Sequence, residues 1–246
     1  MKRSLQTLMV TGGSGFIGTN FIRYLFSRPE FEGRILNVDK LTYAGNPHNL
    51  RDIEESDGAG GSGSGGSDGS GSDGSSSGRG GSDRGGGARY LFACEDICDA
   101  PKMEELIREY GVDTVLNFAA ESHVDRSVHG PQEFISTNIN GTFSLIEAAR
   151  KVWGESGFEG KLFHQVSTDE VFGSLGPEGR FSEESRYDPR SPYSASKAAA
   201  DHLVRAAFHT YGLPVTISNC SNNYGPYQFP EKLIPLMLLN MREGKA

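Results

Sequence analysis

The chain has 246 residues, including 33 glycines, and 36% of its residues are hydrophobic. Its 32 acidic residues outnumber its 24 basic residues, and the net charge of −8 argues against nucleic acid or an anionic membrane as a partner. Three cysteines without paired spacing argue against a disulfide framework and a metal site. Without a membrane-spanning run or a signal peptide, we expect a cytoplasmic protein.

Strands and helices alternate along the chain. Apolar runs predict strands at residues 8–10, 35–38, 90–92, 114–116, 162–166 and 215–217. Apolar residues at helical spacing predict helices at 16–26, 103–110, 131–152 and 192–211, and one more from residue 231. This alternation predicts an α/β fold with a doubly wound parallel sheet covered by helices on both faces.

One stretch breaks this pattern. Residues 58–87 contain 15 Gly, 9 Ser, 3 Asp, 2 Arg and 1 Ala. Such a segment has nothing to bury, so we expect a flexible insertion in a surface loop. A glycine-rich RNA-binding segment is the other interpretation, which the two arginines and the absence of aromatic residues disfavour.

A glycine turn joins the first predicted strand to the first helix. Gly12, Gly15 and Gly18 would allow a tight turn and a close approach of a pyrophosphate to free N–H groups at the helix N-terminus. Asp39 ends the second strand 21 residues after Gly18, where a carboxylate can accept hydrogen bonds from ribose hydroxyls. An acid there would repel a 2′-phosphate, so the pattern favours NAD over NADP. A turn used only for packing is the alternative.

Tyr193 and Lys197 lie four residues apart at the start of a predicted helix and therefore share one face. An ammonium group and a nicotinamide cation nearby would lower the pKa of the phenol and make tyrosinate a usable base. In the alternative interpretation, Lys197 simply pairs with Asp201 on an amphipathic helix.

Thr168, Asp169 and Glu170 follow a predicted strand, at the end where open α/β sheets bind their ligands. Two adjacent carboxyl groups can divide acid and base roles if their environments separate their pKa values. A solvated pair of loop carboxylates is the alternative interpretation.

Several longer segments resemble the dTDP-glucose 4,6-dehydratases, a family of extended short-chain dehydrogenase/reductases that act on nucleotide sugars. The similarity is carried by TGGSGFIG, NVDKLTYAGN, EDICDA, FAAESHVDRS, STDEVFG, SPYSASKAAADHLV and NCSNNYGPYQFPEKLIP. It covers nearly the whole chain except 58–87. Related epimerases generally lack the acidic pair, and related decarboxylases usually have Ser in place of Asp169, so this residue favours a dehydratase.

The resemblance implies an NAD-dependent lyase built on a Rossmann-like domain. Tyr193 would take the proton of the sugar C4 hydroxyl, with Thr168 bonded to the same oxygen and Lys197 on the nicotinamide ribose. Hydride would pass from C4 to NAD+. Glu170 would remove the C5 proton and Asp169 would protonate the leaving C6 hydroxyl. Return of the hydride to C6 and of a proton to C5 would then give a 4-keto-6-deoxy sugar.

The resemblance also implies two sets of binding residues. Cofactor contacts are expected at Gly12, Gly15, Phe16, Ile17, Gly18, Asp39, Lys40, Leu41, Thr42, Asp96, Ile97, Phe118, Ala119, Ala120, Glu121, Ser122, Thr137, Tyr193, Lys197 and Asn223. Substrate contacts are expected at Ser122, Thr168, Asn222, Lys232 and Leu233. His123 is expected to have a positional role beside them.

Members of the resembled family continue into a C-terminal lobe with further contacts to the nucleotide. The chain is therefore expected to be one NAD-binding domain, 1–246, from which most of that lobe is missing. Its partners would be a nucleotide sugar, with dTDP- and UDP-glucose not distinguished, and a second copy that pairs through the helices at 131–152 and 192–211. A related epimerase or decarboxylase, or a non-catalytic NAD-binding module, are the alternatives.

Overall fold

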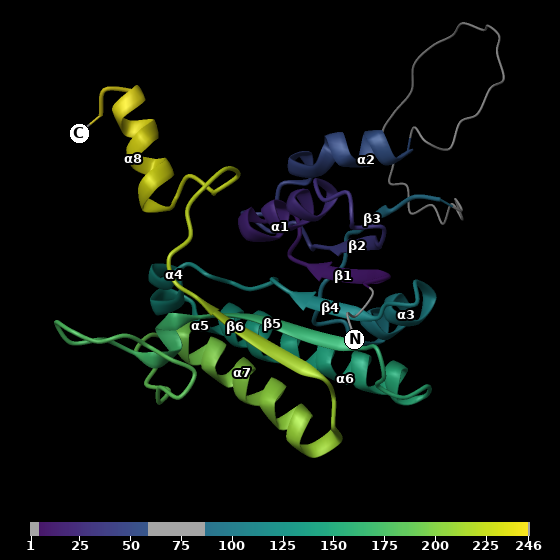
Figure 1. Ribbon diagram of the computed structural model, residues 1–246. Coiled ribbons are helices and arrows are strands. Elements are labelled where there is room, and N and C mark those ends of the chain that lie inside the picture. Colours follow the sequence, from purple (N-terminus) through teal and green to yellow (C-terminus); the bar gives the residue numbers. More distant parts are fainter. Residues whose placement is uncertain (1–4, 59–86, 246) are drawn as a thin grey trace, which may run out of the picture.

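A computed structural model describes residues 5–58 and 87–245 of the chain. Its centre is a sheet of six parallel strands in the order β3-β2-β1-β4-β5-β6 (Figure 1). The strands are β1 (Thr7–Thr11), β2 (Arg34–Val38), β3 (Tyr90–Ala93), β4 (Thr114–Asn117), β5 (Leu162–Thr168) and β6 (Val215–Cys220). From β1 the sheet extends to β2 and β3 on one side, and β4, β5 and β6 follow on the other side of β1. The carboxyl ends of β1 and β4, where the strand order switches sides, therefore define the crevice of the fold.

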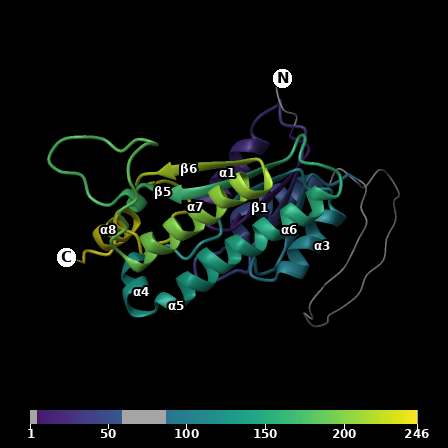
Figure 2. The ribbon, with the colours of Figure 1, turned by 90° about the horizontal axis from the view of Figure 1, so that it is seen from below.

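Helices lie on both faces of the sheet. The helices α1 (Phe16–Phe26) and α2 (Arg51–Gly58) lie on one face, with the 3-10 turn η1 (Pro47–Leu50) between them. On the other face, α3 (Ala100–Glu109), α6 (Thr142–Gly154) and α7 (Pro192–Tyr211) lie side by side (Figure 2). Five shorter or terminal elements complete the described chain: α4 (Val124–His129), α5 (Pro131–Phe134), η3 (Ile135–Gly141), η4 (Asp169–Phe172) and α8 (Leu233–Arg242).

The strands carry apolar side chains on both faces of the sheet, and a separate hydrophobic core packs against each face. Leu8 and Val10 of β1 face the core that contains Ile22 of α1, whereas Met9 between them faces the larger core that contains Trp153. Successive side chains of a strand point to opposite faces, so an uninterrupted apolar run is what a doubly covered sheet requires. The predicted α/β class with a parallel sheet is confirmed.

The predicted elements are found with small shifts of their ends. The helices at 16–26 and 192–211 have the predicted bounds, while β5 and β6 continue to Thr168 and Cys220. The helix predicted over 131–152 is instead α5, a π-helical segment η3 (Ile135–Gly141) and then α6. Apolar periodicity does not distinguish α from π winding, because it reports only which face is buried. Two short helices, α2 and α4, were not predicted from the sequence.

The glycine-rich insertion predicted at 58–87 falls almost entirely outside the described residues. The residues on its two sides lie next to each other. The Asp57 carboxylate, one residue from the end of α2, accepts hydrogen bonds from the backbone N–H groups of Arg89 and Tyr90 at the start of β3. Because the two ends already meet, the sheet does not depend on the length of the connection.

No helix in the described part of the chain combines the length and the apolar character needed to span a membrane. Among the same residues, His, Cys, Asp and Glu side chains form no group of three or more that could hold a metal ion.

Candidate active site

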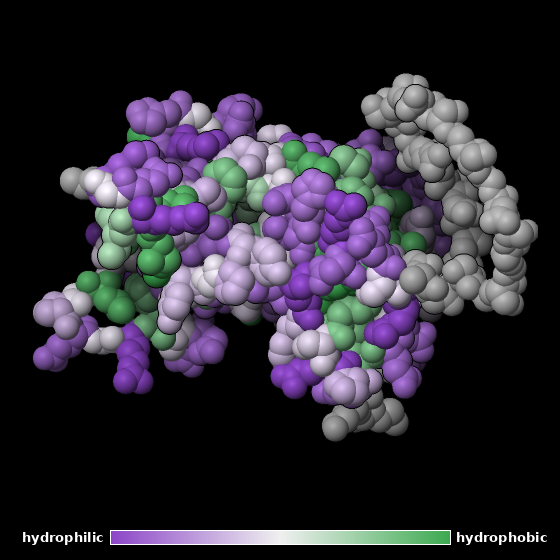
Figure 3. All heavy atoms as spheres, turned by 90° about the horizontal axis from the view of Figure 1, so that it is seen from above, coloured by the Kyte–Doolittle hydropathy of each residue, from purple (hydrophilic) through white to green (hydrophobic). Residues whose placement is uncertain are grey.

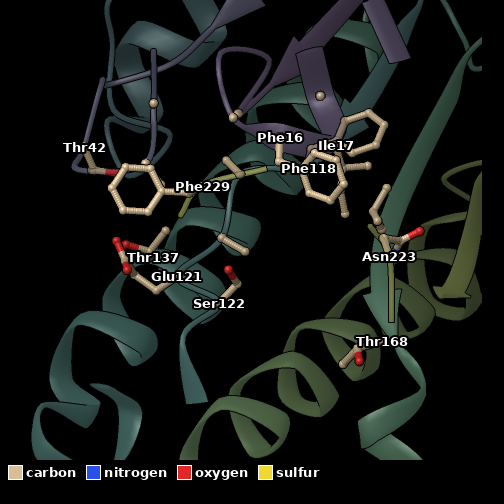
Figure 4. A pocket seen from close by; sticks show the side chains of 18 of the residues that line it. Phe16, Ile17, Thr42, Phe118, Glu121, Ser122, Thr137, Thr168, Asn223 and Phe229 are labelled. Atoms are coloured by element: carbon tan, nitrogen blue, oxygen red, sulfur yellow. The ribbon is translucent and has the colours of Figure 1, made fainter. Parts of the chain in front are cut away.

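A cavity of about 590 Å³ lies at the carboxyl ends of the strands. Its walls come from the segments that follow all six strands, because parallel strands end at the same edge of the sheet. Figure 4 shows Thr42, Glu121 and Thr137 toward one end of the cavity and Thr168 and Asn223 toward the other. The cavity is therefore elongated between the ends of β2 and β5.

The cavity brings together almost every residue that the sequence analysis assigned to the site. The predicted residues that line it are Gly12, Gly15, Phe16, Ile17, Gly18, Asp39, Lys40, Thr42, Asp96, Ile97, Phe118, Ala119, Ala120, Glu121, Ser122, Thr137, Thr168, Glu170, Tyr193, Lys197, Asn222, Asn223, Lys232 and Leu233. Two predicted residues do not line it, Leu41 and Asp169. Leu41 has a left-handed backbone with φ of 55°, and its N–H group donates to Asp39 Oδ1 at 2.8 Å.

The glycine turn is packed too closely for side chains. A Cβ atom on Gly12 would lie 2.7 Å from the backbone nitrogen of Ala119, and one on Gly18 would lie 2.4 Å from the carbonyl oxygen of Gly12. Gly15 caps α1 without a side-chain hydrogen bond, and the residues of this first turn, 15–18, line the cavity, so their N–H groups are available to a ligand there. This cradle suits the pyrophosphate of a dinucleotide, since helix N-termini attract anions.

Asp39 is held in place at the end of β2. Its Oδ2 accepts a hydrogen bond from the N–H of Ser14 at 3.0 Å, and its Oδ1 accepts the one from Leu41. Burial raises the pKa of the Asp39 carboxyl group, and these two backbone donors partly offset the rise. The glycine turn and the acid are thus one hydrogen-bonded unit, as a site for a ribose and the neighbouring pyrophosphate requires.

Tyr193 and Lys197 are both buried at the start of α7. The Lys197 Nζ donates to the carbonyl oxygen of Val166 at 2.7 Å, and the side chain of Asp201 accepts instead from Ser167 Oγ at 2.6 Å and from the Tyr187 hydroxyl at 3.1 Å. Burial lowers the pKa of Lys197, with the charge of Asp201 acting against it. Lys197 is therefore hydrogen-bonded to β5 and not to Asp201.

Whereas the expected lowering depends on a nicotinamide cation as well as on Lys197, the surroundings of Tyr193 within the protein raise the pKa of its phenol. Burial raises its pKa, and the negative charge of Glu170 raises it further, while a hydrogen bond with Thr168 lowers it. Burial also disfavours the positive charge of Lys197, which is one of the two groups expected to lower the pKa of the phenol. The expected proximity of Tyr193 to Thr168 is present.

The two adjacent carboxyl groups occupy different places. Thr168 caps η4 by accepting from the N–H of Glu170 at 3.2 Å. Glu170 then lines the cavity, where burial and the charge of Asp169 raise its pKa and Lys232 lowers it. Asp169 lies outside the cavity lining, with its Oδ1 3.5 Å from Thr168 Oγ1. The local turn therefore separates the environments of the two acids.

Sequence similarity assigns the chain to a known family. A sequence model of the family described as GDP-mannose 4,6 dehydratase matches residues 81–246, which are 166 of the 246 residues. The chain belongs to this family. The expected resemblance to dTDP-glucose 4,6-dehydratases is confirmed as well. A probable dTDP-glucose 4,6-dehydratase of Sinorhizobium fredii is 48% identical over 242 residues, which are 97% of this chain and 59% of that protein. For dTDP-glucose 4,6-dehydratase 1 of Escherichia coli the identity is 45%, over 97% of this chain and 60% of that protein.

Solved structures of the family share the fold. The dTDP-glucose 4,6-dehydratase DesIV of Streptomyces venezuelae, crystallised with NAD bound, matches with a TM-score of 0.78 and 40% identity over 97% of this chain and 63% of that one. The Bacillus anthracis enzyme in complex with NAD matches with a TM-score of 0.76 and 40% identity, over 98% of this chain and 63% of that one. This member of the family thus spans about three fifths of the length of the relatives that it matches.

One buried residue of the site was missed by the sequence analysis. Asn138, in the π-helical segment η3, is only 1% exposed and joins the backbone of Glu121 to Ser196 Oγ. Ser196 in turn donates to the carbonyl oxygen of Tyr193 at 2.7 Å. Only the tertiary contacts mark this asparagine, since an Asn within a predicted helix carries no signal of its own. Tyr43, Phe229 and Glu231, which unlike Asn138 line the cavity directly, were missed in the same way.

Proposed function

We propose that this chain carries the NAD-binding and catalytic part of a nucleotide-sugar 4,6-dehydratase that acts on dTDP-glucose. The observation that carries the proposal is the meeting of Tyr193, Thr168 and Glu170 at one end of a cavity whose other walls include the glycine turn and Asp39. A dehydration that proceeds through a transient oxidation of the sugar requires a dinucleotide site and acid–base side chains in the same cavity. The identity of 45 to 48% with dTDP-glucose 4,6-dehydratases supports the same substrate.

NAD fits the residues that are present. The first turn of α1 would hold the pyrophosphate, Asp39 a ribose, and Lys197 the ribose next to the nicotinamide. A carboxylate at position 39 disfavours the 2′-phosphate of NADP by like-charge repulsion. When bound, NAD supplies a reversible acceptor for the hydride of the sugar. The other residues that were assigned to the cofactor and that line the cavity would make the remaining contacts with it.

The proton transfers are assigned to this chain's own side chains. Tyr193 takes the proton of the C4 hydroxyl while Thr168, bonded to the same phenol, orients that hydroxyl. Glu170 takes the C5 proton, for which its raised pKa makes it a better base than an ordinary glutamate. Asp169 gives its proton to the C6 hydroxyl, which leaves as water. The hydride taken from C4 is then returned to C6 and a proton is returned to C5, so the sugar loses one water in total and its overall oxidation level is unchanged. Asp169 Oδ1 lies 3.5 Å from Oγ1 of Thr168, which lines the cavity, so the acid is placed next to the proposed sugar site.

Substrate binding is assigned to Ser122, Asn222, Lys232 and Leu233 together with Thr168, all of which line the cavity. The relatives are longer than this chain, and we propose that further contacts to the nucleotide come from a C-terminal lobe outside 1–246. Binding of the remote nucleotide normally helps to orient the reacting sugar, so the lobe would contribute to the rate as well as to affinity.

A cytoplasmic homodimer completes the proposal. Large apolar side chains are exposed on the helices α4, α6 and α7 and on η3, which are neighbours in the fold: Val128, Ile135, Phe143, Phe208 and Tyr211. Burial of these side chains against a second copy would remove apolar surface from water.

The test is to incubate the purified chain with dTDP-glucose and NAD and to assay for the 4-keto-6-deoxy product. Formation of that product, and its loss in Tyr193→Phe, is the expected result. Formation of a C4 epimer would show that the chain is an epimerase and not a dehydratase. Tight NAD binding without any product would reduce the proposal to a non-catalytic NAD-binding module.

A further inference from the structure

Three loops that follow different strands meet at the carboxylate of Glu231. The Tyr43 hydroxyl, from the loop after β2, donates to Glu231 Oε1 at 3.0 Å. From α4, after β4, Arg126 Nη2 lies 3.4 Å from Glu231 Oε2 and His123 Nε2 lies 3.7 Å from the same oxygen. Glu231 itself follows β6 and is 16% exposed, so both of its oxygens have partners inside the protein.

Tyr43 and Arg126 also contact each other directly. The guanidinium carbon of Arg126 lies 3.8 Å from the centroid of the Tyr43 ring, which is a close cation–π stack. The other contact of the ring is edge-on with Phe229, at a centroid distance of 5.5 Å. Three residues from three loops are thus joined pairwise, which makes the arrangement more rigid than a single surface ion pair.

His123 fixes the position of Arg126 in this group. It caps α4, and its Nδ1 accepts a hydrogen bond from the N–H of Arg126 at 3.4 Å. Next to Glu231, the Lys232 Nζ donates to the carbonyl oxygen of Ser122 at 3.2 Å. The segment after β6 is therefore bound to the loop after β4 at two successive residues.

Outside this group the segment has few attachments. None of the residues of α8, which begins at Leu233, is buried. Before Glu231, the carbonyl oxygen of Pro226 accepts from Asn20 Nδ2 at 2.9 Å, and Arg23 stacks over Tyr227 at 5.3 Å. In the described part of the chain, the contacts of Glu231 and Lys232 are therefore the last side-chain hydrogen bonds and ion pairs that hold this segment against the cavity before the exposed helix α8.

We infer that Tyr43, Arg126 and Glu231 form a clasp that closes the cavity and sets the position of Lys232 and Leu233 over it. Tyr43 and Glu231 line the same cavity as the glycine turn, so the clasp couples retention of the dinucleotide to placement of the substrate segment. This inference rests on the proposed binding of NAD. The three residues are positioning residues, and no proton transfer is assigned to them.

The experiment compares the rate of NAD release from the unaltered chain with that from Tyr43→Phe, Arg126→Ala and Glu231→Gln. Each variant loses at least one of the close contacts among the three residues, so we expect release to be roughly fivefold faster in each of them. In a double-mutant cycle, Arg126→Ala and Glu231→Gln should be less than additive, because they remove the same contact. The matched control is Arg28→Ala, which removes a similar stack of Arg28 on Tyr24, at 4.3 Å, from residues that do not line the cavity.

Hydrogen exchange of the backbone amides at 226–234 gives a second measurement that needs no cofactor. It should be faster in Arg126→Ala and Glu231→Gln than in Arg28→Ala, while the melting temperatures stay close. Unchanged NAD release together with unchanged exchange would overturn the clasp. If the unaltered chain binds no NAD, the proposed function fails, and the exchange rates alone decide whether the clasp exists.

Discussion

The side-chain amide of Asn138 forms two hydrogen bonds with the backbone of Glu121. Its Oδ1 accepts from the Glu121 N–H at 2.9 Å, and its Nδ2 donates to the Glu121 carbonyl at 3.0 Å and to Ser196 Oγ at 2.8 Å. One buried side chain therefore connects the loop after β4 to the helix that carries Tyr193.

Asn138→Ala should be one of the more damaging substitutions in the chain. It leaves the Glu121 N–H and carbonyl without their partner, at a cost of about 2–4 kcal/mol in the free energy of unfolding. We also expect weaker NAD binding, because Glu121 lines the cavity. Chemical unfolding and NAD titration measure the two effects, with Asn240→Ala in α8 as the control. An unfolding free energy equal to that of the control would contradict the assigned role.

Gly18→Ala should abolish NAD binding. Its Cβ would lie 2.4 Å from the Gly12 carbonyl oxygen, so the turn and the first turn of α1 would have to separate. Gly154→Ala, at the end of α6, is the matched control because its Cβ would meet nothing within 4 Å. There the substitution should leave binding unchanged and raise stability by up to about 1 kcal/mol, as an alanine in a helix does. NAD titration of both variants is the measurement. Equal NAD affinities of Gly18→Ala and Gly154→Ala would contradict the proposed pyrophosphate site.

Tyr193→Phe should keep the fold and lose the chemistry. The ring packs edge-on against Phe134 at 6.3 Å, and phenylalanine preserves that contact. Removing an acid–base group typically reduces the rate by about 10² to 10⁴. NAD affinity should change far less than the rate of C4 oxidation. Tyr224→Phe, at a residue that is 75% exposed, is the control; equal rates for the two variants would exclude Tyr193 as the proton acceptor.

Glu170 should make the protein less stable as the pH rises. Burial raises its pKa above 4.5, so the folded state holds the proton more tightly than the unfolded state does. Its contribution to stability is therefore full below pH 4.5 and is lost as the pH rises through the raised pKa. Glu170→Gln should be more stable than the unaltered chain at neutral pH, and the difference should shrink in acid. Denaturant unfolding over this pH range tests the sign, and a difference that grows in acid would contradict it.

The helix α8 should tolerate polar substitutions. Figure 3 shows apolar side chains at the surface on the side of the molecule that carries α8, and Leu238 and Met241 are 62% and 76% exposed. Leu238→Glu and Met241→Glu should change the free energy of unfolding by no more than about 0.5 kcal/mol. They should also reduce self-association, which sedimentation velocity measures. Loss of cooperative unfolding in these variants would show that α8 is packed in solution.

Much of the fold could be predicted from local patterns. Doubly buried strands appear as short apolar runs and helices as apolar residues at helical spacing, so α1 and α7 were predicted with the observed bounds. The glycine turn and Asp39 could be found because a fixed backbone geometry needs glycine at fixed positions and an acid at the end of the next strand. These features depend on residues that are close in sequence or on a repeated unit of the fold.

Tertiary structure decided the features that depend on distant residues. The sequence placed Asp169 and Glu170 together, but only the turn at η4 directs Glu170 into the cavity and leaves Asp169 outside its lining. The sign of the pKa shift of Tyr193 follows from burial, which no spacing of residues reveals. The contacts of Asn138 and Glu231 join loops that are far apart along the chain and meet only because parallel strands end at one edge of the sheet.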